Sequence, residues 1–518
     1  MRSRALLSWV VVTAIIIAAN AQAQDNSNQY LKPTCEATFT RDHVNFLKVV
    51  DVDKDGVLDI LAGTSVQGLL YDYEYMGADC SGDWEPEWTF NTNGDVRDVV
   101  VANLNSDGEN EVLVNAVKSK IGTGNPSEYY FVLSQRGIEK WNFDKECGWS
   151  RAVAAADVDS TGIKNTIIGT LGGKICVIKD NSKDKKPVLW SHTSKYPISQ
   201  IESAEMTGDR NPEVIALGYN PRGAEVTGLD YLGNKLWAYE IEGGIYAGGG
   251  LDMMSVTDLE GDGMAEAIVG TFKKGLLIID GDGNVKESFD TGGTIVSVVH
   301  TQDLEGDGSK EIIVGSKPKI FVVNPLGQQL WSAEVATTVY SIDTADMNGD
   351  GIKDVIAGTT RQVRVYDGSN GRLLGMWTYQ EEIQGMTSVY DVKDANAKSI
   401  QAADLDGDGD IELVVGFGWE EDQGDNNFLF GDVRVLELNK DYEAATTTIK
   451  SMDDEPDREP EKKKTTTTMK PEVPTTTLPA EYVPEHREDP DDEGGSGLCC
   501  IPALGAIFSL MAAVVAKV

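Results

Sequence analysis

The sequence has few of the residues that most enzymes use for catalysis. Its 518 residues include only four His and six Cys, and 45 basic residues stand against 84 acidic ones, which gives a formal net charge of −39. No G-x-S-x-G, H-E-x-x-H or P-loop motif occurs. Because so much negative charge repels phosphate backbones and anionic lipid headgroups, we expect no nucleic-acid partner. Cations are the partners that this composition favours.

The N-terminus predicts export from the cell. Arg2 and Arg4 precede an uncharged run, and Ala21-Gln22-Ala23 has the small-x-small pattern of a cleavage site, so residues 1–23 are interpreted as a signal peptide. The alternative, a membrane anchor helix, needs about 20 apolar residues, and this run is shorter. Outside the cell disulfides are allowed. Four cysteines could form two bridges in any of three connectivities, or could remain free buried thiols: Cys35, Cys80, Cys147 and Cys176.

The C-terminus predicts display at the cell surface. Residues 447–497 are rich in Thr, Pro and acidic residues and are interpreted as a disordered stalk. Residues 498–518 form a hydrophobic anchor or sorting segment, whose 18 uncharged residues from Leu498 to Val515 span about 27 Å as a helix. This tail resembles the sorting segments of bacterial and archaeal surface proteins. Cys499 and Cys500 are either lipid attachment points or structural residues.

A nine-residue acidic pattern recurs eight times between these ends. Its starts lie 43 to 58 residues apart, which is the period of a propeller blade. The copies begin at Asp51, Asn103, Asp157, Glu205, Asp258, Asp303, Asp346 and Asp404.

Short apolar strands flank each acidic copy. One strand precedes it and three follow, and the fourth strand carries Trp in six copies, at Trp88, Trp141, Trp190, Trp237, Trp331 and Trp377. The Trp residues are best explained by packing between blades. We therefore predict an all-β, eight-bladed β-propeller over residues 24–446, in which Ala37 to Thr40 completes the last blade and closes the ring. A seven-bladed ring and an open solenoid are the alternatives.

The acidic copies have the composition of calcium loops. Positions 1, 3, 5 and 9 carry carboxylates or amides, and position 6 is Gly in seven of the eight copies. Hard oxygen ligands in this number suit Ca²⁺ better than Mg²⁺, which demands a stricter octahedron. An EF-hand would need Glu at position 12, where the five copies inspected have apolar residues such as Ala62 and Val314. The calcium is expected to stabilise the ring.

These copies resemble the VCBS and FG-GAP repeats of integrin-α-type propellers, whose D-x-D-x-D-G-x-x-D/E loops bind Ca²⁺. The resemblance covers about four fifths of the chain and implies five or six calcium sites. Thr161 and Asn165 in the third copy, and Arg210 and Pro212 in the fourth, depart from the pattern, so both copies are expected to be empty. The implied ligands are the residues at positions 1, 3, 5, 7 and 9, with position 7 acting through its carbonyl at Val57: Asp51, Asp53, Asp55, Val57 and Asp59; Asn103, Asn105, Asp107, Glu109 and Glu111; Asp258, Glu260, Asp262, Met264 and Glu266; Asp303, Glu305, Asp307, Ser309 and Glu311; Asp346, Asn348, Asp350, Ile352 and Asp354; and Asp404, Asp406, Asp408, Asp410 and Glu412.

The longer insertions predict a binding face opposite the calcium loops. Ala116 to Glu128 and Phe417 to Gly431 join second to third strands, and Tyr379 to Ser399 joins a fourth strand to the next first strand. Trp149 and Trp419 lie in connections on that side and are either ligand-stacking or packing residues.

The expected function is a secreted, cell-surface adhesion or ligand-binding module for an extracellular protein or glycan, attached to the membrane through its tail. A calcium-dependent polysaccharide lyase, a structural surface-coat protein and a quinoprotein dehydrogenase are the alternatives. The last rests on Gly-x-x-x-Trp at Gly137, Gly233 and Gly327, but its adjacent cysteine pair is absent from the propeller.

Overall fold

The computed structural model describes residues 30–439, except 41, 76, 78–83, 119–126, 144–146, 149, 180–187, 246–251, 380–394 and 423–426. All of these lie in one compact unit, Met1–Asp454; the second unit, Glu455–Val518, lies outside the described residues. The predicted signal peptide, stalk and C-terminal segment also fall outside, as do Cys80 and Trp149. Within the described part of the chain, no helix has the length and apolar character needed to cross a membrane.

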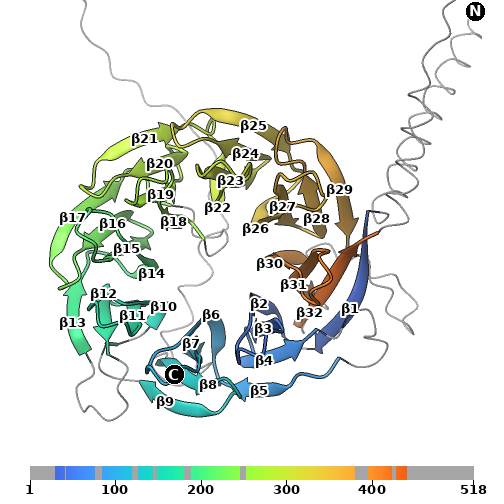
Figure 1. Ribbon diagram of the computed structural model, residues 1–518, viewed down its shortest axis with the longest axis horizontal. Helices are drawn as coiled ribbons and strands as arrows, with labels where there is room; N and C mark the ends of the chain where they lie inside the picture. The colour runs from blue at the N-terminus through green and yellow to red at the C-terminus, as the bar shows by residue number, and fades with distance from the viewer. Residues whose placement is uncertain are drawn as a thin grey trace, which may run out of the picture. The chain divides into compact units, whose positions relative to one another are not determined.

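Eight four-stranded antiparallel sheets form the blades of a propeller (Figure 1). Blade 1 consists of β2 (Val44–Val50), β3 (Asp59–Thr64), β4 (Leu69–Glu74) and β5 (Trp88–Asn91). Blade 2 consists of β6 (Asp95–Ala102), β7 (Glu111–Lys118), β8 (Ser127–Ser134) and β9 (Glu139–Phe143). Blade 3 consists of β10 (Ser150–Ala156), β11 (Asn165–Thr170), β12 (Lys174–Ile178) and β13 (Val188–Thr193). Blade 4 consists of β14 (Ile198–Ala204), β15 (Glu213–Asn220), β16 (Gly223–Leu229) and β17 (Lys235–Ile241).

The second half of the ring repeats the same order. Blade 5 consists of β18 (Met254–Thr257), β19 (Glu266–Gly270), β20 (Leu276–Ile279) and β21 (Val285–Phe289). Blade 6 consists of β22 (Ile295–Gln302), β23 (Glu311–Lys317), β24 (Lys319–Val323) and β25 (Gln329–Glu334). Blade 7 consists of β26 (Val339–Ala345), β27 (Asp354–Thr359), β28 (Gln362–Tyr366) and β29 (Leu373–Thr378). Blade 8 consists of β30 (Asn396–Ala403), β31 (Glu412–Asp422), β32 (Asn427–Leu438) and β1 (Leu31–Thr40).

The N-terminal strand closes the ring as predicted. β1 pairs antiparallel with β32, from Leu31 opposite Leu438 to Thr40 opposite Phe430, and thus supplies the fourth strand of blade 8. In Figure 1 the blue β1 lies beside the orange β32, although they come from opposite ends of the propeller sequence. The strand is longer than the predicted Ala37 to Thr40. Because β1 pairs with β32, blade 8 has four strands like the other blades, and β32 is not left as an unpaired edge strand.

The first strand of each blade lies at the centre of the ring and the fourth lies outside (Figure 1). Successive first strands contact each other around the whole ring, from β2 to β30 and back to β2. Each nine-residue acidic segment joins a first strand to a second strand, as predicted. Because all first strands run in the same direction along the axis, all eight acidic segments emerge on one face, and the first strands begin at the other face.

The core lies between blades. The second strands are buried along their length, as in β3, β11 and β27, because a neighbouring blade covers each of their faces. One cluster, for example, joins Leu61 and Leu70 of blade 1 to Val96 and Val112 of blade 2. Continuous apolar strands therefore occur where both faces are covered.

The tryptophans of the fourth strands pack between blades, which confirms the prediction. Trp88 donates its indole N–H to the Gln135 carbonyl of blade 2 at 3.1 Å, and Trp331 donates to Gly368 of blade 7 at 2.7 Å. The ring of Trp88 covers Gly137, where a Cβ atom would lie 2.4 Å from it. Trp190 covers Gly233 in the same way. Blade packing thus accounts for the Gly-x-x-x-Trp pattern at these two glycines without a quinone.

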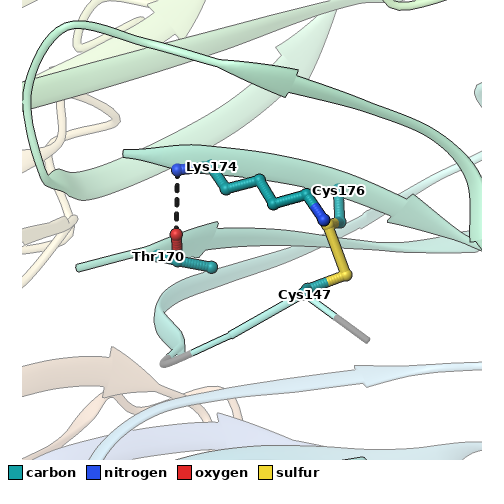
Figure 2. Close-up of a disulfide and its surroundings, with 4 residues drawn as sticks. All are labelled: Cys147, Thr170, Lys174 and Cys176. Atoms are coloured by element: carbon teal, nitrogen blue, oxygen red, sulfur yellow. Dashed lines mark hydrogen bonds between the residues drawn. A yellow bond between two sulfur atoms is a disulfide. The ribbon is translucent and has the colours of Figure 1, made fainter. Parts of the chain in front are cut away.

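One disulfide ties blade 3 to the segment that precedes it. Figure 2 shows Cys147, just before β10, bonded to Cys176 of β12, with the two Cα atoms 6.1 Å apart. Close by, the Lys174 backbone N–H donates to Thr170 Oγ1 at 2.9 Å across the β11–β12 turn. Cys35 is also disulfide-bonded. The connectivity that the sequence left open is therefore settled for Cys147 and Cys176.

The prediction that Phe417 to Gly431 form an insertion loop between two strands is wrong. β31 continues to Asp422, and β32 resumes at Asn427 in register with it, so most of the segment is an extended hairpin. Large residues alternate along both strands, at Phe417 and Trp419 of β31 and at Phe428 and Phe430 of β32, and Trp419 pairs with Phe430, a pattern typical of paired strands. The side chain of Trp419 lies outside the described residues.

Candidate functional sites

The eight acidic segments share one backbone conformation. We call them loops 1 to 8 after their blades, so loop 1 is Asp51 to Asp59 and loop 8 is Asp404 to Glu412. In every loop the side-chain oxygen at position 9 accepts the backbone N–H of position 2, at 2.6 to 3.2 Å. The position 2 side chain is buried in all eight, from Val52 to Leu405. Position 9 therefore fastens the loop to the blade core.

The side chain at position 1 holds the turn. In loop 5, for example, Asp258 accepts the N–H groups of Gly261 at 2.8 Å and Gly263 at 2.7 Å. Position 6 has a positive φ in every loop, and this is why Gly occurs there in seven of them. Loop 4 keeps the same conformation with Arg210 at φ 74°, so its departure from the sequence pattern does not change the turn.

Carboxylate oxygens converge in loops 1, 4 and 8. Three carboxylates in each place one oxygen apiece within 4.8 Å of the others, and these triads are Asp51, Asp53 and Asp59; Glu205, Asp209 and Glu213; and Asp404, Asp406 and Glu412. Two oxygens, Asp404 Oδ1 and Glu205 Oε2, are buried and have no hydrogen-bond partner in the described part of the chain. Converging carboxylate oxygens are the hard ligands that Ca²⁺ prefers, so these three loops fit the ion. Loop 4 is among them although the sequence predicted it to be empty.

The electrostatics of position 9 also favour a cation. The pKa of Asp59 is raised to about 7, chiefly by burial, and the nearby Asp53, Glu87 and Asp51 carboxylates contribute to the increase. Burial likewise raises the pKa of Asp354 and of Glu412 to about 7 each. A bound divalent cation would offset both the desolvation and the mutual repulsion of these carboxylates.

Lysines from the fourth strands enter loops 2 and 5. Lys140 Nζ lies 2.5 Å from Glu111 Oε1 in loop 2, and Lys286 Nζ lies 2.5 Å from Glu260 and 2.9 Å from Glu266 in loop 5. In both cases an ammonium group lies against the carboxylate at position 9. The predicted ligands of these loops are thus brought together around a lysine.

Loops 3, 6 and 7 differ again. In loop 3, Thr161 Oγ1 donates to Asp159 at 2.7 Å, and Asn165 takes the place of the acid at position 9. The predicted ligands of loops 6 and 7 lie in the expected turns. Within the described residues, however, no three carboxylates of these two loops come within 4.8 Å of one another.

A second acidic cluster in blade 1 was missed by the sequence analysis. Asp59, Asp72 and Glu87 place carboxylate oxygens within 4.8 Å of one another. Burial, reinforced by Asp59 and Glu87, raises the pKa of Asp72 to about 8. The only signal in the sequence is Asp72 itself, a charged residue inside the apolar run that became β4.

The first strands enclose a central channel with a cavity of about 660 Å³. The residues that lie six positions before the acidic loops form a ring near the face opposite the loops. In four neighbouring blades, 8, 1, 2 and 3, this ring presents Lys398, Asn45, Arg97 and Arg151, which we call the basic arc. Arg151 Nη2 donates to the Tyr219 hydroxyl at 2.9 Å, and Lys398 Nζ donates to Asn45 Oδ1 at 3.0 Å.

Acidic side chains lie on the other side of the channel. Glu202 and Asp343 lie three positions before their loops in blades 4 and 7, and Asp252 belongs to blade 5. Burial raises the pKa of Glu202 to about 7. It lowers the pKa of Lys398. The charge of the channel is therefore uneven. The basic arc lies on blades 8 to 3, where Arg97 pairs with Asp95 and Asp98 also lines the cavity, and Glu202, Asp252 and Asp343 lie on blades 4 to 7.

Comparison with known proteins agrees with the class that fold and loops define. Residues 331–415, which include loops 7 and 8, match the FG-GAP-like repeat family. The predicted eight-bladed β-propeller is thus confirmed, and the match over residues 331–415 supports the resemblance to FG-GAP repeats. Among curated proteins, none matches the chain by sequence.

The chain is similar to several solved structures at low identity. The rhamnogalacturonan lyase YesW has a TM-score of 0.48 and 16% identity, over 78% of this chain and 74% of that one. The Bacillus licheniformis rhamnogalacturonan lyase PL11 has 0.47 and 15%, over 78% and 74%. BamB from Moraxella catarrhalis has 0.46 and 13%, over 79% and 100%. Similarity at this level carries no inference about function.

Proposed function

We propose that this protein is a calcium-stabilised extracellular propeller that binds an acidic ligand, a glycan or an acidic protein segment, at its central channel. The single observation that carries the proposal is the basic arc in a chain whose net charge is −39. Arg151 and Lys398 hydrogen-bond to neutral groups, and neither has a carboxylate within 4.0 Å among the described residues. Partly buried cations that form no direct ion pair favour an anionic ligand.

The size and position of the channel support this assignment. A cavity of about 660 Å³ lies within the range of roughly 300 to 1,000 Å³ that is usual for small-molecule sites, so one or two sugar units or an acidic side chain fit it. The basic arc lies at the start of the first strands, so the ligand would enter from the face opposite the acidic loops. This is the face that the insertions predicted.

Calcium at the acidic loops has a structural role in the proposal. The three convergent loops lie at the ends of first strands that themselves line the channel. Cations there would fix the ends of those strands and keep the arc in place. The signal peptide, stalk and hydrophobic tail support display of such a module at the cell surface, where it acts in adhesion.

A pair of matched double variants tests the channel as the ligand site. Arg151→Gln with Lys398→Gln removes two positive charges from the arc, whereas Lys195→Gln with Lys319→Gln removes two from exposed ion pairs on outer strands and their flanks. On a glycan array containing uronate oligomers and neutral sugars, the first pair is expected to lose binding of the acidic glycans and the second to keep it. Equal binding by both would overturn the channel site.

The same material separates binding from catalysis. A calcium-dependent lyase needs a basic residue beside a metal-bound uronate, whereas the basic arc lies at the opposite end of the first strands from the loops. Incubation with polygalacturonate and calcium is therefore expected to leave the polymer intact. Absorbance from a new carbon–carbon double bond would show that the protein is a lyase and would overturn the assignment as a binding module.

A further inference from the structure

Blade 1 has a carboxylate at a core position where the other blades do not. Asp72 of β4 pairs with Leu61, two residues after the end of loop 1. The residues paired in the same way in blades 2 to 8 are Val132, Val177, Gly228, Ile278, Val322, Val365 and Val435. Asp72 is only 1% exposed. A buried carboxylate at an otherwise apolar position is costly unless a positive charge accompanies it.

The neighbouring position on the fourth strand makes the contrast sharper. On the fourth strand, one residue pairs with the position equivalent to Asp72, and the residue before it is this neighbouring position. It is Lys140 in blade 2 and Lys286 in blade 5, and it is Leu or Thr in blades 3, 4, 6, 7 and 8. In blade 1 it is Glu87, whose N–H donates to the Asp72 carbonyl at 2.8 Å. Where two blades supply an ammonium group to position 9, blade 1 supplies a further carboxylate.

The local geometry leaves these carboxylates without a counter-charge. Asp59, Asp72 and Glu87 place oxygens within 4.8 Å of one another, and Asp72 Oδ1 has no hydrogen-bond partner among the described residues. Together they line a cavity of about 290 Å³. Arg136 also lines it, but its guanidinium forms no ion pair with a described carboxylate. Carboxylate oxygens around a polar cavity have the chemistry of a site for a hard divalent cation.

We propose that blade 1 holds a second divalent cation, bound by Asp59, Asp72 and Glu87 beside the cation of loop 1. Asp59 is the shared ligand because it belongs to both carboxylate triads, the loop triad with Asp51 and Asp53 and the second triad with Asp72 and Glu87. Oxygen ligands alone select Ca²⁺ or a similar hard ion over Zn²⁺ or Cu²⁺. The site is additional to the nine-residue loop motif and does not depend on the ligand proposed for the channel.

Counting bound ions in matched variants tests the second site. Asp72→Val introduces the residue found at the equivalent position of five other blades, and Asp53→Asn removes a ligand that belongs only to the loop triad. Equilibrium binding of Ca²⁺, with Tb³⁺ emission excited through tryptophan as a second measurement, is expected to give one ion fewer for each variant. The double variant is expected to lose two ions. Glu240→Leu, which removes an exposed carboxylate on β17, is the control and should lose none.

Three outcomes would overturn the proposal. Asp72→Val binding as many ions as the wild type is the first, and a double variant that loses only one is the second, because blade 1 would then hold a single ion. The third is a Tm for Asp72→Asn that differs from the wild type equally in calcium and in EGTA. Asp72→Asn keeps the shape of the side chain, so it serves as the folded variant if valine is not tolerated.

Discussion

Replacing Asp404 with asparagine tests the calcium site proposed for loop 8. Asparagine has the same shape, and its oxygen can still accept the Gly409 N–H, which lies 3.0 Å from Asp404 Oδ2. The turn therefore keeps its cap. What the variant loses is the negative charge and the buried Oδ1 atom, which has no hydrogen-bond partner. Its effect on stability is expected to depend on the metal.

The size of the effect follows from linkage. An ion at a hundred times its Kd stabilises the folded state by about 2.7 kcal/mol. The propeller spans residues 30–439, about 410 residues, so at about 2.1 cal/mol/K per residue its unfolding entropy is about 0.9 kcal/mol/K. Asp404→Asn should therefore lower the Tm by about 3 °C in millimolar calcium, and chelation of all three convergent loops should lower it by about 9 °C.

Scanning calorimetry in calcium and in EGTA measures both quantities. Asp258→Asn makes the same change at position 1 of loop 5, where Lys286 already neutralises Glu260 and Glu266. It is expected to show a smaller calcium-dependent shift than Asp404→Asn. If Asp404→Asn lowered the Tm equally in both media, the metal role of loop 8 would be refuted.

Three further predictions use the same Tm measurement. Lys286→Leu should widen the gap between the Tm in calcium and in EGTA, because loop 5 then needs another cation; an unchanged gap would contradict this. Trp331→Ala, which loses the buried ring and its bond to Gly368, should cost about 3–5 kcal/mol, and a calcium-dependent loss would argue against pure packing. Glu202 has a folded pKa of about 7 against an ordinary 4.5, so the stability that its protonated form gives is present below pH 4.5 and lost as the pH rises through 7. The Tm of Glu202→Gln minus that of the wild type should therefore be larger at pH 8 than at pH 5. The same Tm difference at both pH values would show that Glu202 does not titrate in this range.

The architecture could be predicted because its signals are local and repeated. Eight acidic turns with Gly at position 6, each between two apolar runs, determine the strand order and the blade number. The ring closure was predictable too, since blade 8 had three strands and Ala37 to Thr40 had no partner within its own blade. The hairpin of β31 and β32 was missed because Gly418 and the acidic residues near its tip resemble a loop in composition.

The channel and the blade 1 cluster could not be predicted for a different reason. Arg97, Arg151 and Lys398 are far apart in sequence and become neighbours only because blades 8, 1, 2 and 3 are adjacent in the closed ring. Likewise, the sequence gives no register between β4 and β5, so nothing places Glu87 beside Asp72 before the sheet is formed.

The charge at each acidic loop depends on a residue that its own motif does not contain. Loop 5 has an almost complete set of acids, yet Lys286, 20 residues after Glu266, lies against two of them. Loop 4 departs from the motif at Arg210, yet its three carboxylates converge. A motif search ranks loop 5 above loop 4, whereas among the described residues three carboxylates converge in loop 4 and a lysine lies against the carboxylates of loop 5. In blades 2 and 5 a lysine of the fourth strand therefore lies against the acidic turn. In blades 4 and 8, where the same position holds Leu236 and Thr34, we propose that a cation from solution balances the converging carboxylates.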